Sequence, residues 1–340
     1  MKNLIIISVF VISTISLKAQ DIHFTQFDNN LLLLNPANSG LYEGNFRFNS
    51  NYRNQWAALG NVFETYSASV DFGLLKNSRQ QKTTGIGIAA YQDIAGSSKT
   101  KTSKIDLSIS QTVYLSSFSD LSLGVTFSYV DMSANYNGLN WGSQHDGAEF
   151  DQGIASGEAF TGYADRAFDL SAGLLYRWSE NGRNQLEIGG SINNMATPSF
   201  TILQQEDYIP MRFNVFAAKE WVLGNSREWA IKAMAFFNSQ KKAREFVVGG
   251  MLRRSFGQSS RYTGYYKTTD FYFGAYYRLG DAIAPAFKLS FNQRFLVGMS
   301  YDITLSKLSQ ANSFRGGPEL SICYISPFYK MDINSPKNFQ

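Results

Sequence analysis

The feature that most constrains this chain is a two-residue alternation of apolar and polar side chains that recurs along most of its length. In residues 45–53, Phe46, Phe48 and Tyr52 fall on one side, and arginine and asparagine fall on the other. Successive side chains of a strand point to opposite faces, so the pattern predicts a β-strand with one apolar and one strongly polar face. One such strand fits a soluble sandwich as well as a barrel, and only repetition along the chain separates the two.

The same alternation returns in fourteen segments of the chain. We predict an all-β fold, a transmembrane antiparallel β-barrel of about 14 strands, because an even number of strands is typical of bacterial outer-membrane barrels. An even number also returns the chain to the side where it began, so we expect both termini in the periplasm. The segments are residues 45–53, 65–72, 84–91, 104–115, 121–129, 168–178, 186–193, 212–219, 229–237, 245–254, 270–278, 283–291, 295–304 and 319–325.

The polar faces carry ionisable groups in the middle of several segments. Such groups suit a water-filled or plugged lumen, whereas an unpaired charge in the dry core of a soluble protein is costly. Many of the apolar faces end in Tyr, Trp or Phe, as the aromatic girdles of membrane barrels do. A secreted β-sandwich or propeller remains the alternative, because each segment alone is a weak signal. The side chains that we expect to face the lumen are Arg53, Asp71, Asp106, Arg177 and Asp302.

The N-terminus has the pattern of a secretory signal peptide, with Lys2 before an apolar run that begins at Leu4, and with Ala19 before Gln20. The run is too short for a membrane anchor, and no later stretch holds the roughly 20 apolar residues of a spanning helix. We therefore divide the chain into a signal peptide (1–19), a lead-in segment (20–43), the barrel (44–325) and a periplasmic tail (326–340).

Charge and cysteine content exclude several partners and linkages. The formal net charge of the whole chain is +4, and cleavage would remove Lys2 and Lys18 from that excess. A balance this close to neutral implies no nucleic-acid partner. Cys323 is the only cysteine, so the chain has neither an internal disulfide nor a cysteine for a lipid anchor at the cleavage site.

The lead-in segment carries a hydrophobic tetrad that needs to be covered. Asn35-Pro36 and Ser39-Gly40 end any helix or strand there, and four leucines cannot span a bilayer. Because exposed apolar patches are unfavourable, we expect this segment to fold back into the lumen or to cap its periplasmic mouth. A disordered periplasmic leader is the alternative. The residues expected to fill the lumen are Phe24, Phe27, Leu31, Leu32, Leu33, Leu34, Asn35 and Pro36.

The alternation lapses over residues 132–166, which are rich in Gly, Asn, Asp and Ser. A connection this long usually has a function or is disordered, and we expect it to face outward and to contact a cargo protein. Asp146, Glu149 and Asp151 could bind calcium there, but a solvated acidic loop is the favoured interpretation. The cargo-contact candidates are Tyr136, Trp141, Phe150, Phe160 and Tyr163.

The sequence offers little chemistry for an enzyme. His23 lies in the lead-in segment, and His145 lies beside Asp146 in the long loop. A neighbouring His-Asp pair is far more often a polar loop than part of a hydrolase site. Phosphate-binding glycine motifs, paired cysteines and clustered histidines are absent from the sequence. We predict no catalytic residue, no metal site and no cofactor.

The chain resembles the PorP/SprF family, outer-membrane proteins of the type IX secretion system in Bacteroidetes. The resemblance begins in FTQFDNNLLLLNPANSG, YRNQW and TYSASVDF, and it returns in GAYYRLGDAIAPAF, VGMSYDITLSKL and GGPELSICY. It spans essentially the whole mature chain, whereas residues 132–180 are the most individual part. Matching positions include Gly274, Tyr277, Arg278, Asp281, Ala282, Gly298, Ser300, Tyr301 and Asp302.

The resemblance implies a barrel that lies in outer-membrane lipid and works with other components of the secretion and periplasmic machinery. Members of this family support the secretion and cell-surface anchoring of a cargo protein that carries a C-terminal targeting domain. Such cargo is often a large adhesin, including adhesins that drive gliding motility. The residues themselves leave a general porin or solute channel open as the alternative, because periodicity indicates a barrel and nothing about its cargo.

Overall fold

The protein is described here by a computed structural model. It describes residues 24–55, 63–77, 82–96, 98–134, 141–145, 149–151, 153–155, 157, 164–180, 184–201, 206–224, 228–260, 265–306 and 313–327. The predicted signal peptide and most of the predicted periplasmic tail lie outside these residues. Within them, no helix is both long enough and apolar enough to cross a membrane.

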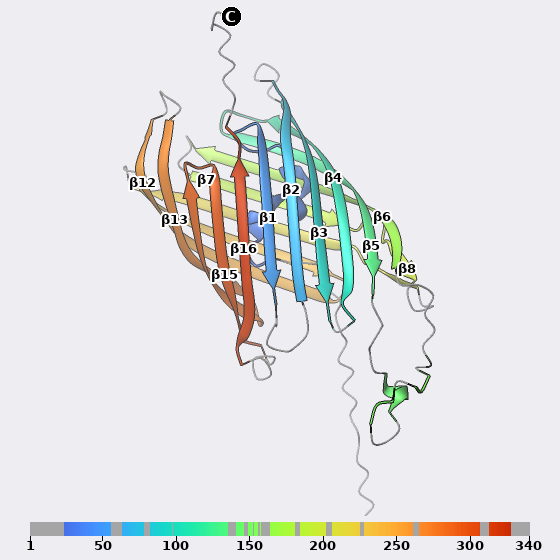
Figure 1. Cartoon of the computed structure of the whole chain (residues 1–340). Helices are drawn as coiled ribbons and strands as arrows, with labels where there is room; N and C mark the ends of the chain where they lie inside the picture. Colours follow the sequence, from blue (N-terminus) through green and yellow to red (C-terminus); the bar gives the residue numbers. More distant parts are fainter. Residues whose placement is uncertain are drawn as a thin grey trace, which may run out of the picture.

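Fourteen antiparallel strands form a closed barrel in which β1 pairs with β16 as well as with β2 (Figure 1). The predicted fold class and strand number are therefore confirmed. The barrel strands are β1 (Phe46–Asn54), β2 (Phe63–Asn77), β3 (Lys82–Ala95), β4 (Thr100–Tyr114), β5 (Ser119–Ser133), β6 (Ala164–Glu180), β7 (Asn184–Asn193), β10 (Arg212–Leu223), β11 (Trp229–Gln240), β12 (Ala243–Ser260), β13 (Tyr265–Arg278), β14 (Ala282–Phe291), β15 (Phe295–Thr304) and β16 (Arg315–Ile325).

Several strands are longer than the predicted segments. Strand β6 has 17 residues and β12 has 18, whereas eleven and ten were predicted for them. The extra residues continue the hydrogen-bonded ladder beyond the stretch in which apolar and polar side chains alternate. Sequence periodicity therefore finds the membrane-facing centre of a strand more readily than its ends.

The barrel is apolar outside and polar on part of its inside, the reverse of a soluble core. On β4, the outward side chains of Ile105, Leu107 and Ile109 are 55%, 45% and 41% exposed, while Asp106 and Ser108 between them are buried. An outer surface of this kind is stable in lipid rather than in water.

The inner wall carries an apolar patch on one side of the barrel. On the strands from β10 to β14, polar inward positions such as Asn214 and Lys288 alternate with apolar side chains that the sequence analysis did not predict. These side chains form one cluster with residues of the lead-in segment, which explains why they are apolar: they pack against protein and not against water. The wall side of this cluster includes Phe216, Met234, Phe236, Val247, Met251 and Tyr276.

The two mouths of the barrel differ in their connections. At one mouth, the turns between consecutive strands have three to five residues, and we call it the short-turn mouth. The other, the long-loop mouth, carries the connections from β5 to β6 and from β7 to β10. The second of these contains a separate two-stranded sheet of β8 (Ser199–Thr201) and β9 (Glu206–Tyr208). Strand β16 ends at the short-turn mouth, drawn at the top of Figure 1.

Candidate functional site

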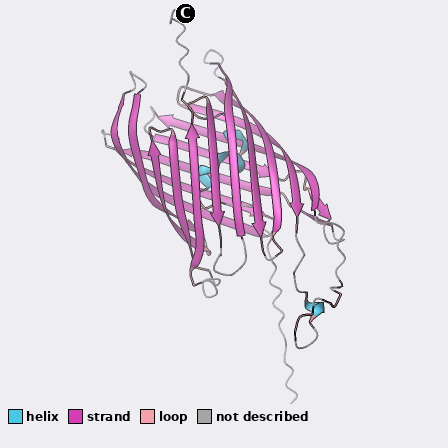
Figure 2. Cartoon of the chain, viewed as in Figure 1, coloured by secondary structure: helices cyan, strands magenta, loops and turns pink. Residues whose placement is uncertain are grey.

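A segment of the chain passes through the inside of the barrel before β1 begins. Residues 24–41, called here the lumenal segment, form three short helical turns: η1 (Phe27–Asn29), α1 (Leu31–Leu34) and η2 (Pro36–Asn38). Figure 2 shows these turns enclosed by the strands. The helices stay short because Asn35 is extended and is followed by proline, which restricts the residue before it and lacks an N–H.

The start of the lumenal segment is held by carboxylates of β15 and β16 near the long-loop mouth. Glu319 accepts hydrogen bonds from the backbone N–H groups of Thr25 at 2.7 Å and Gln26 at 2.9 Å. The Thr25 hydroxyl donates to Asp302 at 2.9 Å. Asp302 also forms an ion pair with Arg53 at 2.7 Å. Arg53 and Asp302, which were predicted separately, are thus in direct contact.

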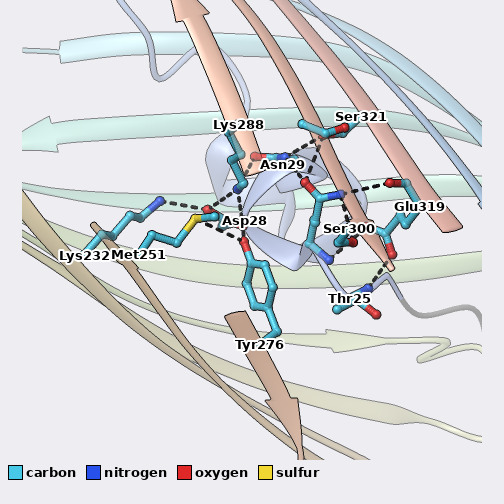
Figure 3. Close-up of polar contacts among 12 residues, drawn as sticks. Thr25, Asp28, Asn29, Lys232, Met251, Tyr276, Lys288, Ser300, Glu319 and Ser321 are labelled. Atoms are coloured by element: carbon cyan, nitrogen blue, oxygen red, sulfur yellow. Dashed lines mark hydrogen bonds and ion pairs between the residues drawn. The ribbon is translucent and has the colours of Figure 1, made fainter. Parts of the chain in front are cut away.

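Asp28 forms the most highly charged contact of the lumenal segment (Figure 3). Its carboxylate accepts from Lys232 of β11 at 2.9 Å and from Lys288 of β14 at 2.9 Å. The Tyr276 hydroxyl of β13 donates to the same carboxylate at 2.7 Å. Lys288 also donates to the side chain of Asn29 at 2.8 Å. Three wall strands therefore meet at a single acidic residue.

Sequence reasoning missed the Asp28 contact, although one signal was available. Asp28 is the only charged residue between positions 24 and 41, and Lys232 and Lys288 each interrupt a mostly apolar inward face. A lone acid in an apolar lead-in segment, together with isolated lysines on apolar strands, favours pairing between them because buried charges need partners.

Asn35 crosslinks the lumenal segment to neighbouring strands. Its Nδ2 donates to the backbone oxygens of Leu174 at 2.9 Å and Gly190 at 3.1 Å, and its Oδ1 accepts from the N–H of Ala37 at 2.9 Å. Asn35 is fully buried. A Cβ atom at Gly173 would overlap Asn35 Oδ1, so glycine is required there for the two chains to approach.

Serine hydroxyls of the wall bind the backbone oxygens that the short helices leave unpaired. Ser191 donates to the oxygen of Leu34, and Ser110 donates to that of Ser39, each at 2.8 Å. Ser122 makes the same contact with the oxygen of Ala37 at 2.8 Å. Buried carbonyl groups need partners, and these hydroxyls supply them.

An ion pair of the wall holds the end of the lumenal segment. Arg47 of β1 binds Asp71 of β2 at 2.9 Å, and both side chains are buried. Asp71 also accepts from the N–H of Gly40 at 2.7 Å, while Arg47 donates to the oxygen of Asn38 at 2.9 Å. Asp71, a predicted lumenal residue, therefore contacts the lumenal segment directly.

Of the other two predicted lumenal residues, Arg177 forms an ion pair between strands, and Asp106 lies beside a lysine of its own strand. Arg177 of β6 binds Asp120 of β5 at 2.9 Å. Asp106 lies 3.9 Å from Lys104, which is also 3.1 Å from Asp169. The pairs Arg177–Asp120 and Lys104–Asp169 join strands of the wall to each other.

The apolar side of the lumenal segment packs against the apolar wall. Phe27 stacks on Phe236 with ring centroids 5.1 Å apart and meets Tyr276 edge-on at 6.1 Å. Phe24, Leu32 and Leu34 are buried, whereas the side chains of Leu31 and Leu33 are only partly buried. Pro36, at the start of η2, is also buried.

The cargo-contact candidates fall in the long loop, which is described only in part. Trp141 precedes the turn η4 (Gly142–Gln144), and Phe150 is 51% exposed with its ring against His145 at 4.9 Å. Tyr136, Phe160 and Tyr163 lie outside the described residues, as does the calcium candidate Asp146. Asp151 accepts a hydrogen bond from the N–H of Gly153.

Metal chemistry finds no support in the part of the chain that the structure describes. There, no group of three or more His, Cys, Asp or Glu side chains is placed to hold a metal ion. The buried carboxylates named above are engaged instead by lysine, arginine, hydroxyl or backbone N–H groups.

Comparison with known proteins identifies a family. The model of the type IX secretion system membrane protein PorP/SprF matches residues 16–324. No curated protein matches the chain. Among solved structures, the toluene transporter TodX of P. putida is 11% identical with a TM-score of 0.52, over 88% of this chain and 94% of that one. The monoaromatic hydrocarbon channel CymD is 10% identical with a TM-score of 0.50, over 88% and 93%. At such identity these structures show the barrel fold alone.

Proposed function

The chain belongs to the PorP/SprF family of type IX secretion system membrane proteins, and on that premise we propose that it is a closed docking barrel of the outer membrane. The proposed partner is a secreted surface protein that carries a C-terminal targeting domain and is adhesin-like. Other components of the secretion machinery are expected partners of any membrane protein of this system. In a species that glides, the same partner would serve motility.

The observation that supports the proposal is the lumenal segment inside the barrel. The lumenal segment is bonded to strands on several sides of the barrel and packs against the apolar wall. A general solute channel needs a continuous aqueous path, whereas a docking barrel needs only a rigid scaffold that presents loops. We therefore favour docking over the porin alternative.

Orientation follows from the two mouths. Short turns of outer-membrane barrels face the periplasm and longer loops face outward, so we assign the short-turn mouth to the periplasm. The end of β16 then leads into the periplasm. The first described residues are bonded near the opposite mouth, at Asp302 and Glu319. A periplasmic N-terminus stays a prediction.

The partner is expected to contact the connection from β5 to β6, with Phe150 among the exposed side chains. Loops carried by a rigid scaffold commonly provide binding surfaces. Large exposed aromatic rings are frequent at the centres of protein interfaces, which supports this assignment.

The test is recovery of partners from the native outer membrane in mild detergent, followed by mass spectrometry. A variant in which a short Gly-Ser turn replaces residues 135–163 should assemble normally and lose the surface protein. A variant with the same replacement at residues 199–208, in the second long connection, is the matched control. Retention of the partner by the first variant would move the docking surface elsewhere. A partnerless wild-type barrel that conducts ions would favour the channel.

A further inference from the structure

An arginine lies on the lipid-facing side of β12 near the short-turn mouth. Leu252 and Phe256, two residues before and after Arg254, are 39% and 49% exposed. Side chains two residues apart on a strand share a face, so Arg254 also points away from the lumen. A charged side chain on this face of a barrel is costly in the middle of the bilayer and is tolerated where it reaches the headgroups.

The strand register places Arg254 at the edge of the bilayer. Its direct partner on β11 is Trp229, the first residue of that strand, and the ladder between the two strands ends with this pair. Tryptophan is enriched at the interface between membrane and water. Strands β12 and β13 continue beyond this level, where residues 255–260 pair with residues 265–270. Arg254 therefore lies at the height of the headgroups, and the orientation assigned above makes this the periplasmic leaflet.

Aromatic rings hold the guanidinium group of Arg254 in place. Its Cζ atom lies 4.5 Å from the ring centroid of Trp229 and 5.0 Å from that of Phe256. Phe271, the direct partner of Arg254 on β13, meets Phe256 edge-on with ring centroids 5.5 Å apart. These cation–π contacts are favourable, but they give the N–H groups of the guanidinium no oxygen acceptor.

The tip of the Arg254 side chain has no counter-ion among the described residues. Of its nitrogen atoms, Nε alone is buried without a hydrogen-bond partner, and the residue as a whole is partly exposed. Within the part of the chain that the structure describes, no hydrogen bond or ion pair engages the two Nη atoms, which keep accessible surface. Their N–H groups can therefore donate to an acceptor from outside the chain.

We propose that Arg254 binds the phosphate group of a glycerophospholipid in the periplasmic leaflet. The planar guanidinium and a phosphate form paired, charge-assisted hydrogen bonds, which suits the two accessible Nη atoms. The acyl chains would cover the rings of Phe273 and Phe287, whose centroids are 5.1 Å apart. Phe273 is the direct partner of Leu252, one step from Arg254 toward the middle of the membrane.

The surroundings of Arg254 favour a lipid over a soluble phosphate ion. Its neighbours on this face, Trp229, Phe256 and Phe271, are aromatic, and a soluble ion would leave their rings uncovered. A phospholipid supplies both an anion for the guanidinium and apolar chains for the rings. The inference does not depend on the docking function, and the assigned orientation decides only which leaflet provides the lipid.

The first experiment measures lipid binding to the full-length protein by native mass spectrometry from a nonionic detergent. The probes are dioleoyl-phosphatidylglycerol and dioleoylglycerol, which has the same chains and no phosphate. The first bound phosphatidylglycerol should bind about 10- to 100-fold more tightly, as expected for hydrogen bonds to a charged group. Equal binding of the two probes would overturn the proposal. Soluble glycerol 3-phosphate should bind far more weakly, and equal affinity for it would assign the site to a free phosphate and reject the lipid.

The second experiment repeats the titration with variants. Arg254→Met should lose the preference for the phosphate-bearing lipid, and Arg254→Lys, which keeps the charge without the planar fork, should retain part of it. Arg244→Met is the matched control, because Arg244 is exposed near the other end of the same strand. Gel mobility before and after heating checks that each barrel has folded. An unchanged preference in Arg254→Met, or an equal loss in Arg244→Met, would refute a specific site at Arg254.

Discussion

The substitution Asp28→Asn gives the sharpest test of how the lumenal segment is held. It keeps the shape of the side chain and removes its charge, so Lys232 and Lys288 lose their shared counter-ion. The three side chains are 8%, 25% and 3% exposed, which limits screening by solvent. Breaking a buried ion pair from one side costs about 3–5 kcal/mol, because a buried charge is left uncompensated.

The lost free energy should destabilise the bound position of the lumenal segment and leave the barrel folded. The strands are closed by their own hydrogen bonds, whereas residues 24–30 depend on Asp28, Glu319 and Asp302. A penalty of about 4 kcal/mol raises the population of a detached segment by nearly a thousandfold. Single-channel recording in planar bilayers should show a silent wild type and brief openings of Asp28→Asn.

The double variant D28N/K288M is the control for charge. Methionine removes the ammonium that Asp28→Asn leaves without its counter-ion, so part of the lost stability should return. Asp151→Asn, in the long loop, is a matched acid-to-amide control and should stay silent. Identical traces and identical hydrogen exchange of residues 24–30 in the wild type and Asp28→Asn would refute the assigned role.

Three further perturbations address the lumenal segment and the outer face. Deletion of residues 24–40 should leave an assembled barrel with steady conductance in the same bilayer assay, and a closed barrel would contradict the filling role of the lumenal segment. Gly173→Ala should destabilise the segment by roughly 1–3 kcal/mol in hydrogen exchange, because its Cβ overlaps Asn35. Gly250→Ala, where an added Cβ meets nothing within 4 Å, is its control. Leu107→Arg on the outer face should cost about 2–4 kcal/mol in folding into vesicles, measured by denaturant titration; an unchanged midpoint would place that position away from lipid.

The barrel itself was predictable from sequence because its signal is local. A strand such as β4 alternates between polar and apolar residues over positions 104–110, so the polarity of each residue there indicates which face it lies on. The same logic predicted the lumenal charges Arg53, Asp71 and Asp302, since an ionisable group inside a strand needs a polar or paired environment. The predicted ends of the strands were less accurate, because the alternation of apolar and polar residues is lost toward the strand ends.

The contacts of the lumenal segment were not predictable in detail because they join distant parts of the chain. Lys232 and Lys288 lie 204 and 260 residues from Asp28, and no local pattern records such a pairing. The apolar part of the inner wall can be recognised more easily in the sequence. Strand β11 reads WAIKAMAFFNSQ, which is apolar on both faces for most of its length. The outward face of such a strand contacts lipid. If its inward face is also apolar, that face is expected to pack against protein inside the barrel and not against water.

The way in which the lumenal segment is attached suggests an order for its release. Its end continues into β1 at the short-turn mouth and fits against glycines of β3, β5 and β6, where a Cβ would overlap it. Its beginning is held mainly by ion pairs and charge-assisted hydrogen bonds, from Asp28 to Lys232 and Lys288 and from the backbone of Thr25 to Glu319. Close steric packing against a glycine tolerates little displacement of the segment. The partner in an ion pair, by contrast, can be replaced by water or by another ion. The beginning of the segment is therefore expected to detach before its end, which stays packed against those glycines.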